Sequence, residues 1–287
     1  MPVLREWDPM PRKKGISRVM QPLAPFATRQ GRNMPVTALA IDYAPTEVIP
    51  RHQHDVCQLL YGVRGVMVVS AIAGQWIVPA TRAVWVPANV EHAIRMVGRV
   101  ALRTLYIRQS AARNLPKKCS VVAVSVLMRE LILEATRIAL PYRRHSREGR
   151  LMQLLLDEIV QLKALPLSLP FPSDPRLRII HESIARQPDD DTTTHQWAQK
   201  LGVDPKTIQR LFLRETGLTF GKWRQQARLL KALELLARGE RVLDAALAVG
   251  YDSPSAFATM FQRQLGAPPS GYFRQRGLTV DQGVEAL

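Results

Sequence analysis

Residues 197–204 read Trp-Ala-Gln-Lys-Leu-Gly-Val-Asp, and residues 245–252 repeat the pattern as Ala-Ala-Leu-Ala-Val-Gly-Tyr-Asp. In each stretch an apolar, helix-forming run ends at a glycine, the residue that turns most easily with a positive φ. The Asp or Ser that follows the glycine can cap a second helix. The pattern therefore predicts two helix-turn-helix motifs, at about 193–214 and 241–264.

The two predicted motifs also match in their second helices. Ile208 corresponds to Phe257, Phe212 to Phe261 and Gly217 to Gly266. Between the motifs, Thr219–Leu236 reads as one helix, and 18 residues at a rise of 1.5 Å span about 27 Å. Successive major-groove faces of DNA lie about 34 Å apart, so one chain could place two recognition helices in adjacent grooves.

The outward side chains of the two second helices are the candidate DNA contacts. They are Lys206, Thr207, Gln209, Arg210 and Arg214 in the first motif, and Ser255, Thr259 and Arg263 in the second. Arg and Gln can bond base edges, whereas Lys and Thr suit phosphates or single base contacts. The second set is less basic and predicts looser, more phosphate-directed binding. The alternative is an ordinary polar helix surface, which the doubled motif disfavours.

Residues 176–274 resemble the DNA-binding domain of AraC/XylS-type transcription regulators. The residues that carry the resemblance include Trp197-Ala198, Leu201-Gly202-Val203, Gln209-Arg210-Leu211-Phe212, Trp223-Arg224, Gly250-Tyr251, Phe257, Phe261, Pro269 and Tyr272. The resemblance implies a seven-helix domain, with Lys206, Gln209 and Arg210 at base edges or phosphates, and Ser255 and Thr259 in the corresponding places. In Tyr272-Phe273-Arg274 the arginine comes one residue later than in the usual Tyr-Arg pair.

Upstream of this domain the residue pattern of the chain changes three times. Four prolines between 166 and 175 predict a linker before a DNA-binding domain at 174–276. Residues 119–165 read as helical, with helices at 126–139 and 149–165. An apolar stripe runs along the second helix: Leu151, Leu154, Leu155, Ile159 and Leu162. This stripe could pack on its own domain or pair two chains in a homodimer, and we weigh these equally.

Residues 36–110 consist of short β-branched and aromatic runs separated by Gly and Pro, which predicts a small β-barrel or sandwich. Residues 1–35 read as an irregular N-terminal arm. The fold class is therefore multidomain, with a barrel, two connecting helices and a C-terminal all-α domain.

Three histidines give the barrel region a candidate site. The spacing His52-x-His54-x3-Gln58-x6-Gly65 resembles the first motif of the cupin barrel, with Gln58 where glutamate is usual, and Pro87-x-Asn89-x2-His92 resembles the second. Three imidazoles suit Zn²⁺, Ni²⁺ or Fe²⁺, although Gln58 supplies no charge. The alternative is a pocket without metal in which the histidines contact an organic effector directly.

Composition narrows the class of protein. The chain has 287 residues and a net charge of +16, which favours a polyanionic partner. Its longest strongly apolar run, Val66–Ala73, is far shorter than the roughly 20 residues of a membrane span, so we expect no membrane association. Two cysteines without a metal or disulfide pattern indicate a reduced, cytoplasmic protein.

These observations predict a transcription regulator that binds a double-stranded DNA operator and responds to a small molecule or metal, with no required cofactor. RNA polymerase is a further candidate partner. The alternative is a cupin-type, metal-dependent enzyme with an auxiliary nucleic-acid-binding domain. We expect no enzyme, because only Glu91 accompanies the histidines, and strand alternation turns it away from His92. A general nucleoid protein is disfavoured because the charge is not concentrated in one patch.

Overall fold

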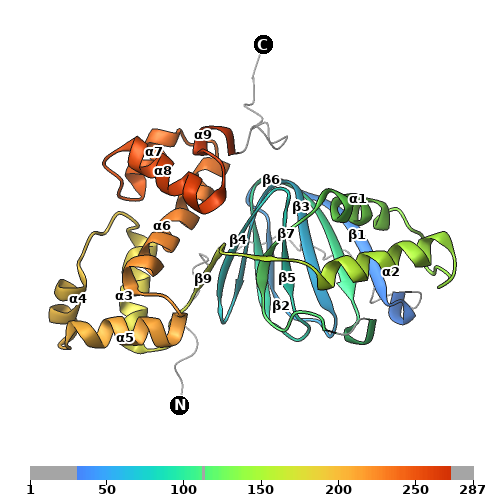
Figure 1. Ribbon diagram of the computed structural model, residues 1–287, viewed down its shortest axis with the longest axis horizontal. Coiled ribbons are helices and arrows are strands. Elements are labelled where there is room, and N and C mark those ends of the chain that lie inside the picture. The colour runs from blue at the N-terminus through green and yellow to red at the C-terminus, as the bar shows by residue number, and fades with distance from the viewer. Residues whose placement is uncertain (1–30, 112–113, 273–287) are drawn as a thin grey trace, which may run out of the picture.

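The computed structural model describes residues 31–111 and 114–272, which form a sheet-rich unit followed by a helical unit (Figure 1). The strands are β1 (Val36–Tyr43), β2 (Val48–His52), β3 (Cys57–Ala71), β4 (Gly74–Pro79), β5 (Arg82–Val86), β6 (His92–Ile107), β7 (Ser120–Ala123), β8 (Ala164–Leu165) and β9 (Ser168–Pro170). The helices are α1 (Val126–Ala135), α2 (Arg147–Val160), α3 (Pro175–Arg186), α4 (Thr194–Leu201), α5 (Pro205–Thr216), α6 (Phe220–Ala237), α7 (Val242–Ala248), α8 (Pro254–Leu265) and α9 (Pro269–Tyr272). Most of the expected arm, and Phe273 and Arg274, lie outside the described residues.

The sheet is antiparallel and folds over on itself. Its strand order is β1-β6-β3-β5-β7-β8, with β2 beside β6 and β4 between β3 and β9. The long strands β3 and β6 bend together where their pairing shifts register, between Gly62 and Val66. Gly65 has a φ of +84°, and a Cβ there would lie 2.3 Å from the carbonyl oxygen of Arg99. The bend that makes the sheet cupin-like therefore requires glycine at this position.

Two apolar layers form on the two faces of the sheet. Alternating residues point to opposite faces, so Leu60 and Leu102 fill the interior while Leu59 and Leu105 pack against α1 and α2, which cover the outer face (Figure 1). Leu155 of α2 belongs to this outer layer and is fully buried. The apolar stripe therefore packs largely on its own domain.

The sheet takes strands from beyond the expected barrel boundary at 110, and the two helices are shorter than expected. Ser146 caps α2, and the residues after α2 return as β8 beside β7. The expected linker also contributes to the sheet, because Ser168–Pro170 pairs with β4 as strand β9. Prolines are tolerated at a sheet edge, where a missing N–H leaves no interior hydrogen bond unmade.

The helical unit contains both predicted motifs, α4–α5 and α7–α8, among the seven described helices from α3 to α9. Gly202 and Gly250 turn with φ values of 64° and 75°. Asp204 accepts a hydrogen bond from the backbone N–H of Lys206 (2.7 Å), and Ser253 caps α8. Helix α6 joins the two motifs, as the spacing predicts (Figure 1).

Helix α6 also packs against the sheet, at β4 and β9. The indole N–H of Trp223 donates to the carbonyl of Pro170 (2.9 Å), and Arg95 of β6 pairs with Glu234 of α6. The apolar interior of the sheet and the core of the helical unit form one continuous cluster. The two units are therefore joined by packing as well as by the chain.

Candidate effector site and nucleic-acid interface

The three predicted histidines converge at one end of the sheet. His52 ends β2 and pairs in register with His92, which begins β6, while His54 follows β2 by two residues. One ring nitrogen from each lies within 4.8 Å of the others. His92 is fully buried, and His52 and His54 are half-buried. The strand pairing thus brings together residues that are 40 positions apart in the sequence.

Backbone carbonyls orient all three rings. Nδ1 of His52 lies 2.8 Å from the oxygen of Pro50, Nδ1 of His54 lies 2.6 Å from that of Val56, and Nδ1 of His92 lies 2.9 Å from that of Val90. A carbonyl oxygen only accepts hydrogen bonds, so each neutral ring carries its proton on Nδ1. Each Nε2 then keeps the lone pair with which imidazole binds a metal.

Gln58 lies against two of these lone pairs. Its Oε1 is 3.1 Å from Nε2 of His54 and 3.2 Å from Nε2 of His92, and its Nε2 donates to Oγ1 of Thr104 (2.9 Å). In this arrangement the lone pairs of the two imidazole nitrogens face the lone pairs of the amide oxygen, and they repel one another. Either a cation between these atoms or rotation of the amide group relieves the repulsion. Three imidazole nitrogens and an amide oxygen are donors that fit Zn²⁺, Ni²⁺ or Fe²⁺.

Burial favours the neutral form of two of the three imidazoles, those of His52 and His92. Burial, helped by the neighbouring His52 and His54 and opposed by the hydrogen bond to Val90, lowers the pKa of His92 to about 4. Burial also lowers the pKa of His52. Glu91 is exposed and pairs with Arg51 (3.5 Å). Among the described residues, no carboxylate belongs to this cluster.

A small cavity of about 110 Å³ adjoins the cluster and shares His52, His54 and Gln58 with it. Thr104 and Tyr106 of β6 line the cavity but were not singled out from the sequence. They follow Leu102 by two and four residues, so all three side chains lie on the same inward face of the strand. This spacing is the signal in the sequence that could have identified them. His181 of α3, outside this cluster, is buried beside Trp223.

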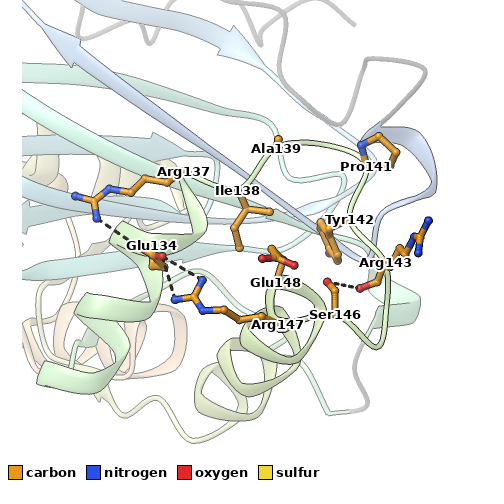
Figure 2. Close-up of a pocket in the computed structure, with 10 residues that line it drawn as sticks. All are labelled: Glu134, Arg137, Ile138, Ala139, Pro141, Tyr142, Arg143, Ser146, Arg147 and Glu148. Carbon is orange, nitrogen blue, oxygen red and sulfur yellow. Dashed lines mark hydrogen bonds and ion pairs between the residues drawn. The ribbon is translucent and has the colours of Figure 1, made fainter.

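A larger cavity of about 450 Å³ lies where α1 connects to α2. Figure 2 shows the guanidinium groups of Arg137 and Arg147 directed at Glu134. In each of these ion pairs the nitrogen and oxygen atoms lie 3.2 Å apart. The pair between Glu134 and Arg147 joins α1 to α2. None of the predicted site residues lines this cavity.

On α5, Lys206, Arg210 and Arg214 are exposed and Thr207 is half-buried. Gln209 is also exposed, but its amide is bonded to neighbouring elements: its Nε2 donates to Oγ1 of Thr194 (3.1 Å), and its Oε1 accepts from the backbone N–H of Phe220 (3.4 Å).

Two further features of α5 were not anticipated. Arg214 pairs with Glu215 (3.2 Å), and Glu215 also accepts from the backbone N–H of Asp174 at the start of α3 (2.9 Å). Leu213, three residues after Arg210, is 56% exposed on the same side of the helix. The sequence alone did not indicate that this apolar side chain faces outward.

On α8, Ser255, Thr259 and Arg263 are all exposed. The hydroxyl of Thr259 donates to the carbonyl of Ser255 (2.9 Å), and the hydroxyls of Ser253 and Ser255 lie 3.1 Å apart. Arg263 is the single basic residue of this helix.

Two family models match the chain. The model described as an AraC-like ligand binding domain matches residues 35–164, and the model described as a helix-turn-helix domain matches residues 197–275. Among residues 31–111 and 114–272, no helix is both long enough and apolar enough to cross a membrane.

Similar proteins include the HTH-type transcriptional regulator NimR of Escherichia coli (strain K12), which is 37% identical over 223 residues, or 78% of this chain and 81% of NimR. RipA of Corynebacterium glutamicum is 33% identical over 103 residues, or 36% of this chain and 31% of RipA. ToxT of Vibrio cholerae, a solved structure, is 11% identical, covers 83% of this chain and 98% of its own, and has a TM-score of 0.35. NimR and RipA are regulators by name, which confirms the interpretation as a regulator rather than an enzyme. The chain is a DNA-binding transcription regulator with a ligand-binding domain, and it belongs to the AraC family.

Proposed function

We propose that operator binding by this regulator is controlled by a divalent metal held on His52, His54, His92 and Gln58. The convergence of three Nε2 lone pairs carries the proposal, because three backbone carbonyls fix the rings in the metal-binding tautomer. Gln58 would add an oxygen ligand and Thr104 would orient it. A bound dication would remove the repulsion between these donors and stabilise this end of the barrel.

The test is the metal content of the purified full-length protein, together with its affinity for an operator selected from random DNA. We expect about one metal ion per chain and an operator affinity that changes about 5- to 150-fold on metal removal. His54→Ala should abolish both effects, whereas His145→Ala, at an exposed position, should leave both unchanged. A protein that binds no Zn²⁺, Ni²⁺ or Fe²⁺ would refute the proposal.

A second candidate is an organic effector that the histidines contact without a metal. The cavity beside the cluster supports this alternative. Saturable binding of a small molecule to chelator-treated protein, with a matching change in operator affinity, would establish it.

For the DNA contacts, we propose that Lys206, Thr207, Arg210 and Arg214 contact one major groove and Ser255, Thr259 and Arg263 the next. The exposed basic side chains of α5 support base and phosphate contacts there. Gln209 would contribute by positioning α5, in place of the base contact that the family resemblance implies.

We also propose that the regulator acts as a homodimer. Exposed apolar side chains on α1 and α2 support this: Val126, Leu127, Leu154 and Val160. RNA polymerase is proposed as a partner at the operator, which binding of purified polymerase to the protein–operator complex would test.

A further inference from the structure

The guanidinium group of Arg228 on α6 bonds to backbone from two separate parts of the helical unit. Its Nε donates to the carbonyl of Pro188 (2.9 Å), and its Nη2 donates to those of Asp189 (3.1 Å) and Asp190 (3.0 Å). These three residues lie between α3 and α4, directly before the first motif. Its Nη1 donates to the carbonyl of Gly250 (3.3 Å), in the turn between α7 and α8. One side chain therefore joins the segment that leads into the first motif to the turn of the second.

The position of Arg228 along α6 explains how it reaches both segments. It lies near the middle of this helix of 18 residues. Figure 1 shows α3, α4 and α5 beside one end of α6 and α7, α8 and α9 beside the other. One turn before Arg228, Arg224 donates to the carbonyl of Thr192 (3.0 Å) and holds the segment before α4 from a second point. The two motifs are thus connected by side-chain hydrogen bonds as well as by α6 itself.

Gly250 fits closely against this guanidinium group. A Cβ at Gly250 would lie 2.8 Å from Nη2 of Arg228 and 3.0 Å from Cα of Asp189. Gly202, the corresponding glycine of the first motif, also has a positive φ, but a Cβ there would meet no atom of the described residues within 4 Å, its chain neighbours aside. The turn alone accounts for Gly202, whereas Gly250 also leaves room for the contact with Arg228.

The arrangement of acceptors suits an arginine. All four are neutral carbonyl oxygens, and they come from two segments about 60 residues apart in the sequence. Arg presents five N–H donors in a planar fork, whereas Lys carries three donors on one nitrogen atom. Lysine at position 228 would keep the positive charge, and we expect it to lose the hydrogen bonds to at least one of the two segments.

We propose that Arg228 is a positioning residue that sets the spacing between the two DNA half-sites that one chain reads. This inference rests on the proposed placement of α5 and α8 in successive major grooves. One base pair inserted between the half-sites moves the second groove by about 3.4 Å along the DNA axis and about 35° around it. The chain can follow this movement only by breaking the hydrogen bonds of Arg228, so one motif loses its contacts instead.

The test uses the full-length protein and three DNAs. The first is an operator selected from random DNA, the second has one base pair inserted between the two segments that one chain protects from hydroxyl radicals, and the third carries one segment alone. The unsubstituted protein should bind the original operator at least about tenfold more tightly than the inserted one. Arg228→Lys should reduce this preference to less than about threefold, with affinity for the single segment within about twofold of the unsubstituted protein.

The preference between the two operators separates positioning from a loss of folded protein. A variant that is merely less folded would bind all three DNAs more weakly by one factor and would keep its preference. Arg178→Lys makes the same change at an exposed position on α3, so it should alter neither the affinities nor the preference.

A second pair of variants approaches the same contact from the other side. Gly250→Ala should reduce the preference as Arg228→Lys does, because its methyl group displaces the guanidinium group. Gly202→Ala is the matched control: it strains a turn of the same kind without touching Arg228, so the preference should remain.

Two results would overturn the inference, and they differ in what else they remove. If the unsubstituted protein binds both operators equally well, the proposed placement in successive grooves fails, and this inference fails with it. If the unsubstituted protein discriminates between the operators and Arg228→Lys and Gly250→Ala discriminate as strongly, only this inference fails.

Discussion

Arg95 and Glu234 form an ion pair that joins the sheet to the helical unit, with Nη1 of Arg95 3.1 Å from Oε1 of Glu234. Arg95 lies three residues after His92 on β6, and Glu234 lies on the helix that connects the two motifs. The Glu234 side chain is 8% exposed and also contacts Arg238. The pair thus joins the strand that carries His92 directly to α6.

Glu234→Gln should lower the stability of the protein at neutral pH by about 2 kcal/mol, because it leaves Arg95 facing a neutral group. Burial raises the pKa of Glu234, but Arg95, Lys231 and Arg238 outweigh burial, so the pKa lies below its usual value. A carboxyl with a lowered pKa stabilises the fold above its unfolded pKa of about 4.3, and this contribution disappears as the pH falls through the folded pKa.

Urea unfolding at several pH values measures this effect. The difference between Glu234→Gln and the unsubstituted protein should be largest near pH 7 and should shrink below about pH 4. Asp244→Asn, which breaks an exposed pair with Arg241, should change little at any pH. A difference that is independent of pH would contradict the assigned role of the Glu234 charge.

Gln58→Glu should raise the affinity for Zn²⁺ or Ni²⁺ at least about tenfold, because it adds a negative charge to a neutral donor set. Without metal, the buried carboxylate should lower the melting temperature, and added metal should restore it. Metal titration by calorimetry and thermal unfolding measure the two effects. Gln75→Glu on β4 is the control, and an equal response there would remove Gln58 from the site.

Arg210→Ala should cost about 1–3 kcal/mol on the selected operator and relax the preference at one base position. Lys206→Ala should weaken binding to all sequences. It should also reduce the slope of the logarithm of the binding constant against the logarithm of the salt concentration by about one, which corresponds to the loss of one phosphate contact. Fluorescence anisotropy on operator and random DNA at several salt concentrations separates the two roles. Equal losses on both DNAs for Arg210→Ala would exclude base reading by this residue.

Gln209→Ala should lower the stability of the helical unit by about 1 kcal/mol, because it removes two hydrogen bonds that join α4, α5 and α6. DNA affinity should fall by the same factor on operator and random sequences. A loss confined to the operator, with an unchanged melting temperature, would restore Gln209 as a base contact.

Leu154→Glu should convert a dimer to monomers, because Leu154 is 42% exposed on the outer side of α2. Leu155→Glu, in the stripe that the sequence allowed either to pair two chains or to pack on its own domain, should instead unfold the sheet-rich unit, since Leu155 is fully buried against the sheet. Sedimentation and circular dichroism distinguish these outcomes. A Leu154→Glu protein that sediments like the unsubstituted chain would refute pairing through this face.

The helix-turn-helix motifs could be predicted from the sequence because their signals are local. Gly202 and Gly250 mark the turns, and nearby caps start the next helices. The histidine cluster could be predicted as a set of residues because its spacing resembles a known motif. The carbonyls that fix the rings could not, since each depends on a particular turn.

Longer-range features left no such signal. The prolines at 166–175 predicted a linker, but they say nothing of the unpaired edge of β4, which accepts Ser168–Pro170 as a further strand. The partner of Glu234 is likewise 139 positions earlier in the chain. A charged residue on an apolar helix face indicates a partner without identifying it.

Strand β9 bears on how regulators of this kind can be recombined. Its backbone completes the edge of the sheet, and its Pro170 carbonyl accepts the Trp223 indole of the helical unit. A chimera spliced within 166–175 would therefore divide an interface between two parents. Inheriting β4, β9 and α6 from one parent would keep these contacts, so the exchangeable module in this chain is larger than its DNA-binding domain.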